Sequence, residues 1–136
     1  MHKKVADYIR ENDRLFEFTG ARLLEVSPGR CVLSMEVSER HMNAAGICQG
    51  GVIFTFADLA FAIASNSHGV MALSVNASIS YLRPALLGDT LVAEAQEVER
   101  TRRLAHYSIT VRKDPSGEKV ALFNGVVYIT GKPYEF

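Results

Sequence analysis

Apolar and polar positions along the chain follow two different periods. Residues 50–67 are apolar at almost every position, which predicts a long helix, and residues 2–12 show a short amphipathic helical pattern. Elsewhere apolar residues alternate with polar ones, as in half-buried strands, and turn residues such as Pro115 and Gly117 separate the runs. The predicted strands are residues 21–26, 31–37, 73–81, 90–99, 104–113 and 120–129.

The order of these elements is a helix, two strands, a long helix and four strands, which predicts an α+β fold with one antiparallel sheet. Because residues 50–67 are apolar on nearly all sides, we expect the sheet to wrap around this helix. An antiparallel sheet wrapped around a central long helix is the hotdog arrangement. Its open edges invite pairing with a second subunit. In the strand predicted over residues 73–81, one face is expected to carry Leu73, Val75, Ala77, Ile79 and Tyr81.

Composition narrows the function classes. The length of 136 residues fits a single domain over residues 1–136. Fifteen Lys and Arg residues balance fifteen Asp and Glu, so no general basic field is present to hold nucleic acid. Cys31 and Cys48 fit no metal-binding spacing, so we expect no metal and two free thiols in a reducing compartment. The N-terminus lacks an apolar signal core, and the longest apolar run is too short to span a membrane, so we expect a cytoplasmic protein.

Asp58 stands in the middle of the apolar run FTFADLAFAIA, where a carboxylate is costly to bury unless it is paired or used. A lone helical Asp is most often a cap or a structural hydrogen-bond partner, but capping is unavailable in mid-helix. Gly50 and Gly51 open the same helix and leave bare N–H groups that can hold an oxygen atom. An acid together with such donors suggests hydrolysis. The helix is expected to present a stripe of small and polar residues, namely Thr55, Asp58, Ala62 and Ser65.

The spacing of Gly51 and Asp58 makes the oligomer part of this hypothesis. Seven residues of helix separate them by about 10 Å. A base or nucleophile and an oxyanion donor must both lie about 3 Å from the reacting atoms, so the two groups cannot act together within one chain. A two-fold dimer with adjacent helices would bring Gly51 of one subunit towards Asp58 of the other. We expect a homodimer as the catalytic unit, assembled further into a homotetramer.

Several motifs then match one family. The helix and the loop before it read Asn43-x-x-Gly46-x-x-Gln49-Gly50-Gly51-x-x-Phe54-x-x-Ala57-Asp58-x-Ala60-Phe61. Later motifs are Asn66-Ser67, Ser80-Tyr81-Leu82-Arg83-Pro84 and Gly88-Asp89. As a set they resemble the hotdog-fold acyl-CoA thioesterases, and among these the phenylacetic-acid-degradation subfamily. The resemblance extends from about Gly20 to Tyr128.

The resemblance implies that water cleaves the thioester of an acyl-CoA substrate, with no metal and no redox cofactor. Asp58 matches the catalytic carboxylate, which acts as a general base or as a nucleophile. The backbone N–H of Gly51 matches the group that polarises the thioester carbonyl. Asn43 matches a polar position near the attacking water or carboxylate, and Ser74 matches a hydroxyl that helps to place water.

One position departs from the family pattern. The family usually has the motif His-Gly-Gly at the start of this helix, and this chain has Gln49-Gly50-Gly51. Glutamine cannot take a positive charge, so only an orienting role remains for it. Arg83 is the best candidate for binding the phosphates of CoA, ahead of the arginines at 100, 102 and 103. Substrate binding is expected at Gly50, Phe54, Ser74, Tyr81 and Arg83, with Phe61 either beside the acyl group or in the core.

Several functions remain open at this point. The subfamily resemblance favours a thioesterase for small or aromatic acyl-CoA, such as phenylacetyl-CoA or hydroxyphenylacetyl-CoA. The alternatives are a medium-chain thioesterase and a non-catalytic acyl-CoA-binding hotdog domain. A hotdog dehydratase is disfavoured, because such enzymes rely on a histidine on or near the helix, and this helix has none. We expect His41 and His68 to be loop residues that face solvent.

Overall fold

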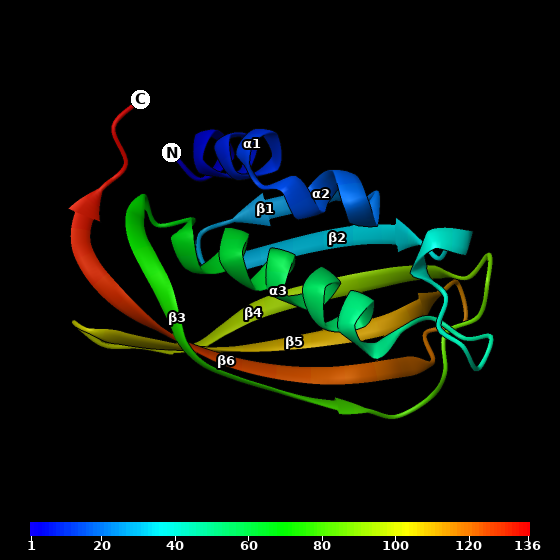
Figure 1. Ribbon diagram of the computed structural model, residues 1–136. Coiled ribbons are helices and arrows are strands. Elements are labelled where there is room, and N and C mark those ends of the chain that lie inside the picture. The colour runs from blue at the N-terminus through cyan, green and yellow to red at the C-terminus, as the bar shows by residue number, and fades with distance from the viewer.

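The computed structural model describes residues 1–136 and contains one six-stranded antiparallel sheet with the strand order β1-β2-β4-β5-β6-β3. Figure 1 shows the sheet curving around the long helix α3 (Gly50–Asn66), as the sequence predicts. The strands are β1 (Arg22–Ser27), β2 (Arg30–Glu36), β3 (Val70–Tyr81), β4 (Thr90–Arg100), β5 (Leu104–Asp114) and β6 (Lys119–Pro133).

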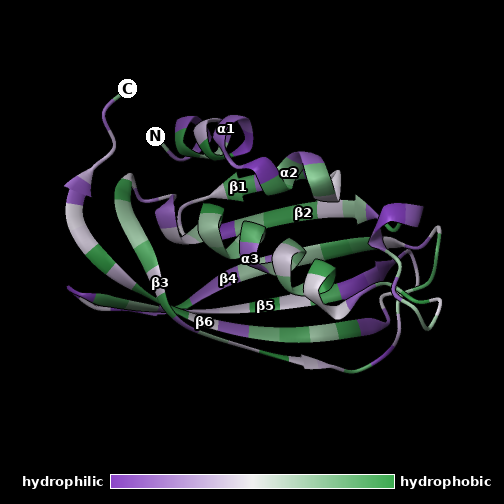
Figure 2. Ribbon diagram, in the orientation of Figure 1, coloured by the Kyte–Doolittle hydropathy of each residue, from purple (hydrophilic) through white to green (hydrophobic).

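The core lies between α3 and the concave face of the sheet. In Figure 2 hydrophobic residues are frequent along α3 and alternate with hydrophilic ones along the strands beneath it. Phe61 is only 1% exposed, and its ring contacts Tyr107 and Phe123 at centroid distances of 5.7 Å. A Cβ on Gly125 of β6 would lie 2.5 Å from the Phe61 ring, so this glycine lets the helix approach the sheet. Phe61 is therefore a core residue.

Two helices precede the sheet, where the sequence predicts one. Helix α1 (His2–Asn12) matches the prediction, whereas α2 (Arg14–Thr19) lies in a segment for which no helix is predicted. Both pack against α3, and α1 also contacts β1. Figure 1 shows them on the side of α3 that the sheet leaves open. They cover part of that side and leave the rest accessible.

The expected single apolar face of β3 is wrong. The register of β3 against β6 shifts between Ser74 and Asn76, so the strand contains a bulge at Val75. Before the bulge Ser74 pairs with Val127, a buried core residue, whereas Leu73 pairs with Tyr128 on the outer face. Directly paired residues share a face of the sheet. The bulge therefore turns Ser74 towards the helix and Leu73 away from it.

Strand β3 forms one edge of the sheet. Leu73 is 56% exposed and Val75 is 60% exposed on this edge, and their neighbours along the strand are also largely exposed. Such an apolar, unpaired edge is a place where another chain can add. None of the helices has both the length and the apolar character needed to cross a membrane.

Candidate active site

The open side of α3 carries the predicted stripe, with one exception. Thr55, Asp58 and Ala62 are half-buried along it, whereas the positions between them are buried. Ser65 is buried, with 1% exposure, and its hydroxyl donates to the carbonyl of Ala62 at 3.3 Å. The stripe therefore ends one turn earlier than predicted.

Asp58 has the properties of a reactive carboxylate. It is half-buried beside apolar neighbours, and no backbone or side-chain group of the chain donates a hydrogen bond to it. Burial raises the pKa of the Asp58 carboxyl, and the negative charge of Asp13 raises it further. Asp13, at the start of α2, therefore lies close enough to influence Asp58. A carboxylate with free lone pairs and a raised pKa is suited to take a proton or to attack a carbonyl carbon.

The N-terminus of α3 is capped by the residue that replaces the family histidine. Gln49 Oε1 accepts a hydrogen bond from the N–H of Gly51 at 2.9 Å. The predicted donor to the thioester carbonyl is therefore occupied by an amide carbonyl oxygen of the same chain. A Cβ at residue 51 would lie 2.6 Å from Gln49 Oε1, so glycine lets the side chain close over the helix end. Gln49 acts here as an acceptor, a cap that leaves its Nε2 free.

Asn43 shapes the loop that leads into α3. Its Oδ1 accepts from the N–H groups of Ala45 at 2.9 Å and Ile47 at 3.2 Å, so this oxygen is committed to the loop. The amide Nδ2 of Asn43 has no protein partner, and Asn43 lines a groove of about 380 Å³. The groove contacts four predicted site residues and is lined by Asn43, Ile47, Cys48, Gly50, Ile53, Tyr81, Leu82, Arg83 and Pro84.

We call this groove the Arg83 groove. Two predicted binding residues in it, Tyr81 and Arg83, are fixed by contacts with different segments of the chain. The hydroxyl of Tyr81 donates to the carbonyl of Gly50 at 2.7 Å, which ties the end of β3 to the start of α3. Arg83 donates to the carbonyl of Lys119 at 2.9 Å and lies 3.7 Å from the Glu118 carboxylate. The Arg83 side chain is half-exposed, so its guanidinium has donors left for an anionic ligand.

Not all predicted site residues come together. Gln49 and Gly51 line a second groove of about 440 Å³ beside Thr55 and Phe18, on a different set of residues from the Arg83 groove. Phe54 is half-buried and packs edge-on against Phe123 at 5.1 Å, so its ring is largely committed to the core. Asp58 lies about two turns from Gly51 on the same helix. A single chain does not bring the acid and the donor to one carbonyl.

The expectation that His41 faces solvent is wrong. His41 is 1% exposed, its Nδ1 accepts from the N–H of Ser38 at 3.1 Å, and its Nε2 lies 3.2 Å from the carbonyl of Phe18. A backbone N–H can only donate and a carbonyl can only accept, so these contacts match an accepting Nδ1 and a donating Nε2. This histidine ties η1 (Glu39–His41) to the end of α2. His68 is half-buried and pairs with Glu97 at 2.9 Å.

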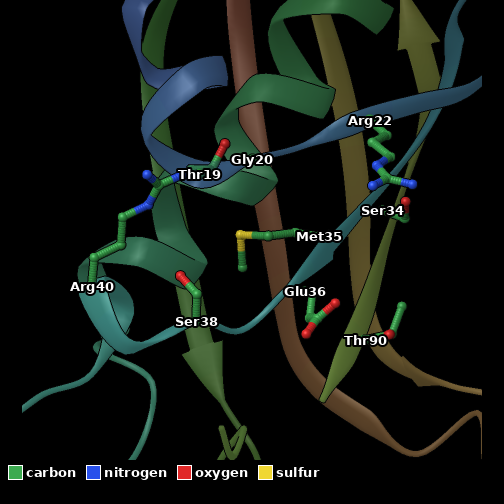
Figure 3. A pocket seen from close by; sticks show the side chains of 9 residues that line it. All are labelled: Thr19, Gly20, Arg22, Ser34, Met35, Glu36, Ser38, Arg40 and Thr90. Atoms are coloured by element: carbon green, nitrogen blue, oxygen red, sulfur yellow. The ribbon is translucent and has the colours of Figure 1, made fainter. Parts of the chain in front are cut away.

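A separate polar pocket of about 310 Å³ lies under α2 (Figure 3). Figure 3 shows Arg40 on one side of it and Arg22 on the other, with Met35 between them. It contains none of the predicted site residues, so it is not part of this site. No three His, Cys, Asp or Glu side chains gather where they could hold a metal ion. The pocket is lined by Thr19, Gly20, Arg22, Ser34, Met35, Glu36, Ser38, Arg40 and Thr90.

Residues 45–120, more than half of the chain, match the family described as the thioesterase superfamily. The chain belongs to the thioesterase superfamily. One relative is a protein of Archaeoglobus fulgidus with the name "Putative esterase", 47% identical over 128 residues, which are 94% of this chain and 82% of that protein. The Escherichia coli acyl-coenzyme A thioesterase PaaI is 36% identical over 115 residues, which are 85% of this chain and 81% of PaaI.

Solved structures of the superfamily agree with the fold. The structure of E. coli PaaI, from the phenylacetic acid degradation operon, superposes with a TM-score of 0.93 at 32% identity, and covers 97% of this chain and 95% of that one. This thioesterase-superfamily chain therefore has the hotdog fold predicted from its sequence. The Streptococcus mutans protein smu.793, bound to acetyl CoA, gives a TM-score of 0.80 at 29% identity, over 84% of this chain and 91% of that one.

Proposed function

We propose that the chain hydrolyses acyl-CoA thioesters in a dimer, with Asp58 of one subunit and the Gly51 N–H of the other acting on the same carbonyl. The observation that carries this proposal is Asp58, a half-buried carboxylate with no hydrogen-bond donor on the open side of α3. A structural Asp in an apolar setting would have a partner. Membership of the thioesterase superfamily suggests that the reaction of this free carboxylate is thioester hydrolysis.

The contact between Gln49 and Gly51 supports the assignment of the carbonyl-binding group. The Gly51 N–H holds an amide carbonyl oxygen at 2.9 Å, which is the distance expected for an oxyanion donor. A thioester carbonyl oxygen resembles the amide oxygen in size and acceptor character. We infer that the substrate carbonyl displaces Gln49 Oε1, and that the N-terminal end of α3 then stabilises the charge that develops on that oxygen.

Two features support a shared site. Gly51 and Asp58 lie about 10 Å apart along one helix, too far to serve one carbonyl. The exposed apolar edge of β3, with Leu73 and Val75, gives a second subunit a surface to cover. A two-fold dimer would contain two identical sites, each with one Asp58 and one Gly51. We propose that two such dimers form a homotetramer.

The reaction needs a proton acceptor and a carbonyl-polarising group. By one route Asp58 takes a proton from water as the water oxygen bonds to the thioester carbon. By the other route the carboxylate oxygen itself bonds to that carbon, and water then cleaves the mixed anhydride. In both, the carbon–sulfur bond breaks and CoA leaves with its electron pair. Asn43 Nδ2 and the inward-turned Ser74 hydroxyl have no protein partners and serve to position water.

The Arg83 groove is the proposed site for CoA. Arg83 presents a half-exposed guanidinium at its rim, which suits a phosphate group. The complex of smu.793 with acetyl CoA supports a CoA ligand in this superfamily. The likeness to PaaI favours phenylacetyl-type acyl groups, and ring stacking would give such groups an advantage of about 0.5–1.5 kcal/mol over alkyl groups of equal area.

The test is release of CoA from acetyl-, hexanoyl-, phenylacetyl- and palmitoyl-CoA by the wild-type protein and Asp58→Asn. We expect the wild type to prefer phenylacetyl-CoA over palmitoyl-CoA, and Asp58→Asn to lose about 10²–10⁴-fold in kcat. Binding without hydrolysis by the wild type would identify a non-catalytic acyl-CoA-binding domain. Equal turnover by Asp58→Asn would contradict the role of Asp58, and a preference for hexanoyl-CoA would favour the medium-chain reading.

Subunit mixing tests the shared site. Gly51→Pro removes the N–H, whereas Gly51→Ala keeps it and requires only a movement of the Gln49 side chain. We expect Gly51→Pro and Asp58→Asn each to be inactive, and mixed dimers of the two to regain activity, because one of their two sites is intact. Absence of rescue after proven subunit exchange would contradict a shared site. A stable, active monomer in sedimentation would do the same.

A further inference from the structure

A third groove, which we call the α1–β3 groove, lies beyond Asp58 on the open side of α3. Its volume is about 580 Å³, within the range of ligand pockets. One wall comes from α1 and α2, the other from the start of β3, and α3 forms the floor. It is lined by Tyr8, Ile9, Asn12, Asp13, Arg14, Leu15, Ala62, Asn66, Met71, Ala72, Leu73 and Tyr134.

Two observations place Asp58 close to this groove. Ala62 on its floor lies one helical turn after Asp58 on the same stripe, a rise of about 6 Å. Asp13 in its wall is close enough for its charge to act on the Asp58 carboxyl. A thioester held at Asp58 would therefore lie within reach of the groove. From Asp58 to Asn66 the floor extends for about 12 Å, enough for a ring or a medium-length alkyl chain.

The chemistry of the groove suits an apolar group. Tyr8, Leu15 and Met71 line the groove and are between 38% and 47% exposed, which is costly unless something covers them. The polar group at the far end is already satisfied, because Asn66 Oδ1 accepts from the Tyr134 hydroxyl at 2.8 Å and from the N–H of Ala72 at 2.9 Å. A charged or strongly polar ligand would gain no free partner from Asn66.

We propose that the α1–β3 groove binds the acyl group of the substrate, so that the two N-terminal helices set acyl specificity. This rests on the proposed function, since it assumes that the thioester lies at Asp58. The groove replaces the earlier candidates Phe54 and Phe61, whose rings are packed against Phe123. The occupant is an aromatic or medium-length acyl chain.

Leu15 and Leu104 give a matched pair for the test, because both are 41% exposed and only Leu15 lines the groove. The probes are free CoA and two thioethers that cannot be hydrolysed, S-phenacyl-CoA and S-dodecyl-CoA. We expect Leu15→Trp to weaken binding of both thioethers at least tenfold, measured by calorimetry, and to leave free CoA binding unchanged. Leu104→Trp, on β5, should change none of the three. Ala62→Leu fills the floor of the groove and provides a second variant if Leu15→Trp folds poorly.

The outcomes separate the two proposals. If the wild type hydrolyses no acyl-CoA but Leu15→Trp still weakens only the thioethers, the catalytic proposal fails and the groove proposal stands. If Leu15→Trp and Ala62→Leu weaken the binding of free CoA and of both thioethers by the same factor, the groove does not bind the acyl group. The same conclusion follows if neither variant changes the binding of any of the three ligands. A groove variant that dissociates the oligomer in sedimentation, while thioether affinity per subunit is unchanged, shows that a second copy covers the groove and also overturns the proposal.

Discussion

Asp58 and Asn66 lie on the same helix, about two turns apart, yet their surroundings differ completely. Asn66 is 6% exposed and fully bonded: its Nδ2 donates to the carbonyls of Ala62 and Ala72, and its Oδ1 accepts from Ala72 and Tyr134. Asp58 is half-buried and receives no hydrogen bond from the chain.

The difference is the one expected between a structural polar residue and the reactive carboxylate that we propose at Asp58. Hydrogen bonds at Asn66 offset the cost of burying its amide and join α3 to β3 and to the C-terminal segment. At Asp58 no hydrogen bond within the chain offsets the cost of burying the charged carboxylate, and this burial raises the pKa of the carboxyl. The two residues are thus expected to respond in opposite ways to substitution, and this can be measured.

The largest effect on folding is expected at Asn66. Asn66→Ala leaves the N–H of Ala72 and two carbonyls without their partner, so the free energy of unfolding should fall by about 1–3 kcal/mol. Urea denaturation measures this loss, and kcat of the folded variant should stay within a few-fold of wild type, because Asn66 lies at the end of the groove far from Asp58, where its loss acts on acyl binding and therefore on KM. Asn76→Ala, on the exposed part of β3, is the control and should alter neither quantity. A loss of kcat as large as that of Asp58→Asn would end the distinction between the two residues.

The cap at the start of α3 should give the next largest effect. Gln49→Ala removes the side chain that competes with substrate for the Gly51 N–H, so KM should fall by up to about tenfold, the equivalent of one net hydrogen bond of about 0.5–1.5 kcal/mol. The same change removes an N-cap and should lower stability by about 0.5–2 kcal/mol. Steady-state kinetics and thermal unfolding measure the two effects. A lower kcat with unchanged KM would instead mean that Gln49 contacts the transition state.

Substitution of Asp58 should stabilise the protein at neutral pH. The folded-state pKa of Asp58 is raised, so the folded chain holds this proton more tightly than the unfolded chain. The favourable contribution is fully present below the unfolded pKa and is lost as pH rises through the folded pKa. Asp58→Asn should therefore have a higher Tm than wild type at pH 7, and this gain should vanish in acid. Asp114→Asn, at the exposed last residue of β5, is the control. A lower Tm for Asp58→Asn at pH 7 would show that the carboxylate is structurally bonded.

The smallest effect is expected from Asp13→Asn, which tests how a neighbouring charge changes the pKa of Asp58. Asp13→Asn removes a negative charge that raises the pKa of Asp58, so that pKa should fall. Since Asp58 must be ionised to act, the acid limb of the profile of kcat/KM against pH should move to lower pH. Asn is as good an N-cap as Asp, so the bond from the N–H of Leu15 and the stability of α2 should survive. An unmoved acid limb would mean that another group controls it.

Much of the fold was predictable from local patterns. The predicted helix over 50–67 and all six predicted strands occur within a few residues of their observed bounds. Helix α2 was missed because its six residues are too few to show a helical period. Its ends did carry a signal: Asp13 caps it by accepting from the N–H of Leu15, and Gly20 follows it with φ 74°.

The site was predicted as residue types rather than as geometry. Asp58 and the Gly50–Gly51 pair stand out in the sequence, because each breaks the pattern around it. The bulge at Val75 has no such signal, since the alternation continues through it, and it reverses the faces of Leu73 and Ser74. The burial of His41 also has no local signal, because Phe18, whose carbonyl its Nε2 meets, lies 23 residues earlier in α2.

The sequence by itself determined the long apolar helix, the six strands, and an acid and a glycine pair on one helix, because all of these follow from the order of neighbouring residues. Only the tertiary structure decided that Gln49 closes over the Gly51 N–H, that Asp13 acts on Asp58, and that α1, α2 and β3 enclose a groove beside Asp58. These features depend on side-chain rotamers and on contacts between segments far apart in the chain, which local periodicity does not encode.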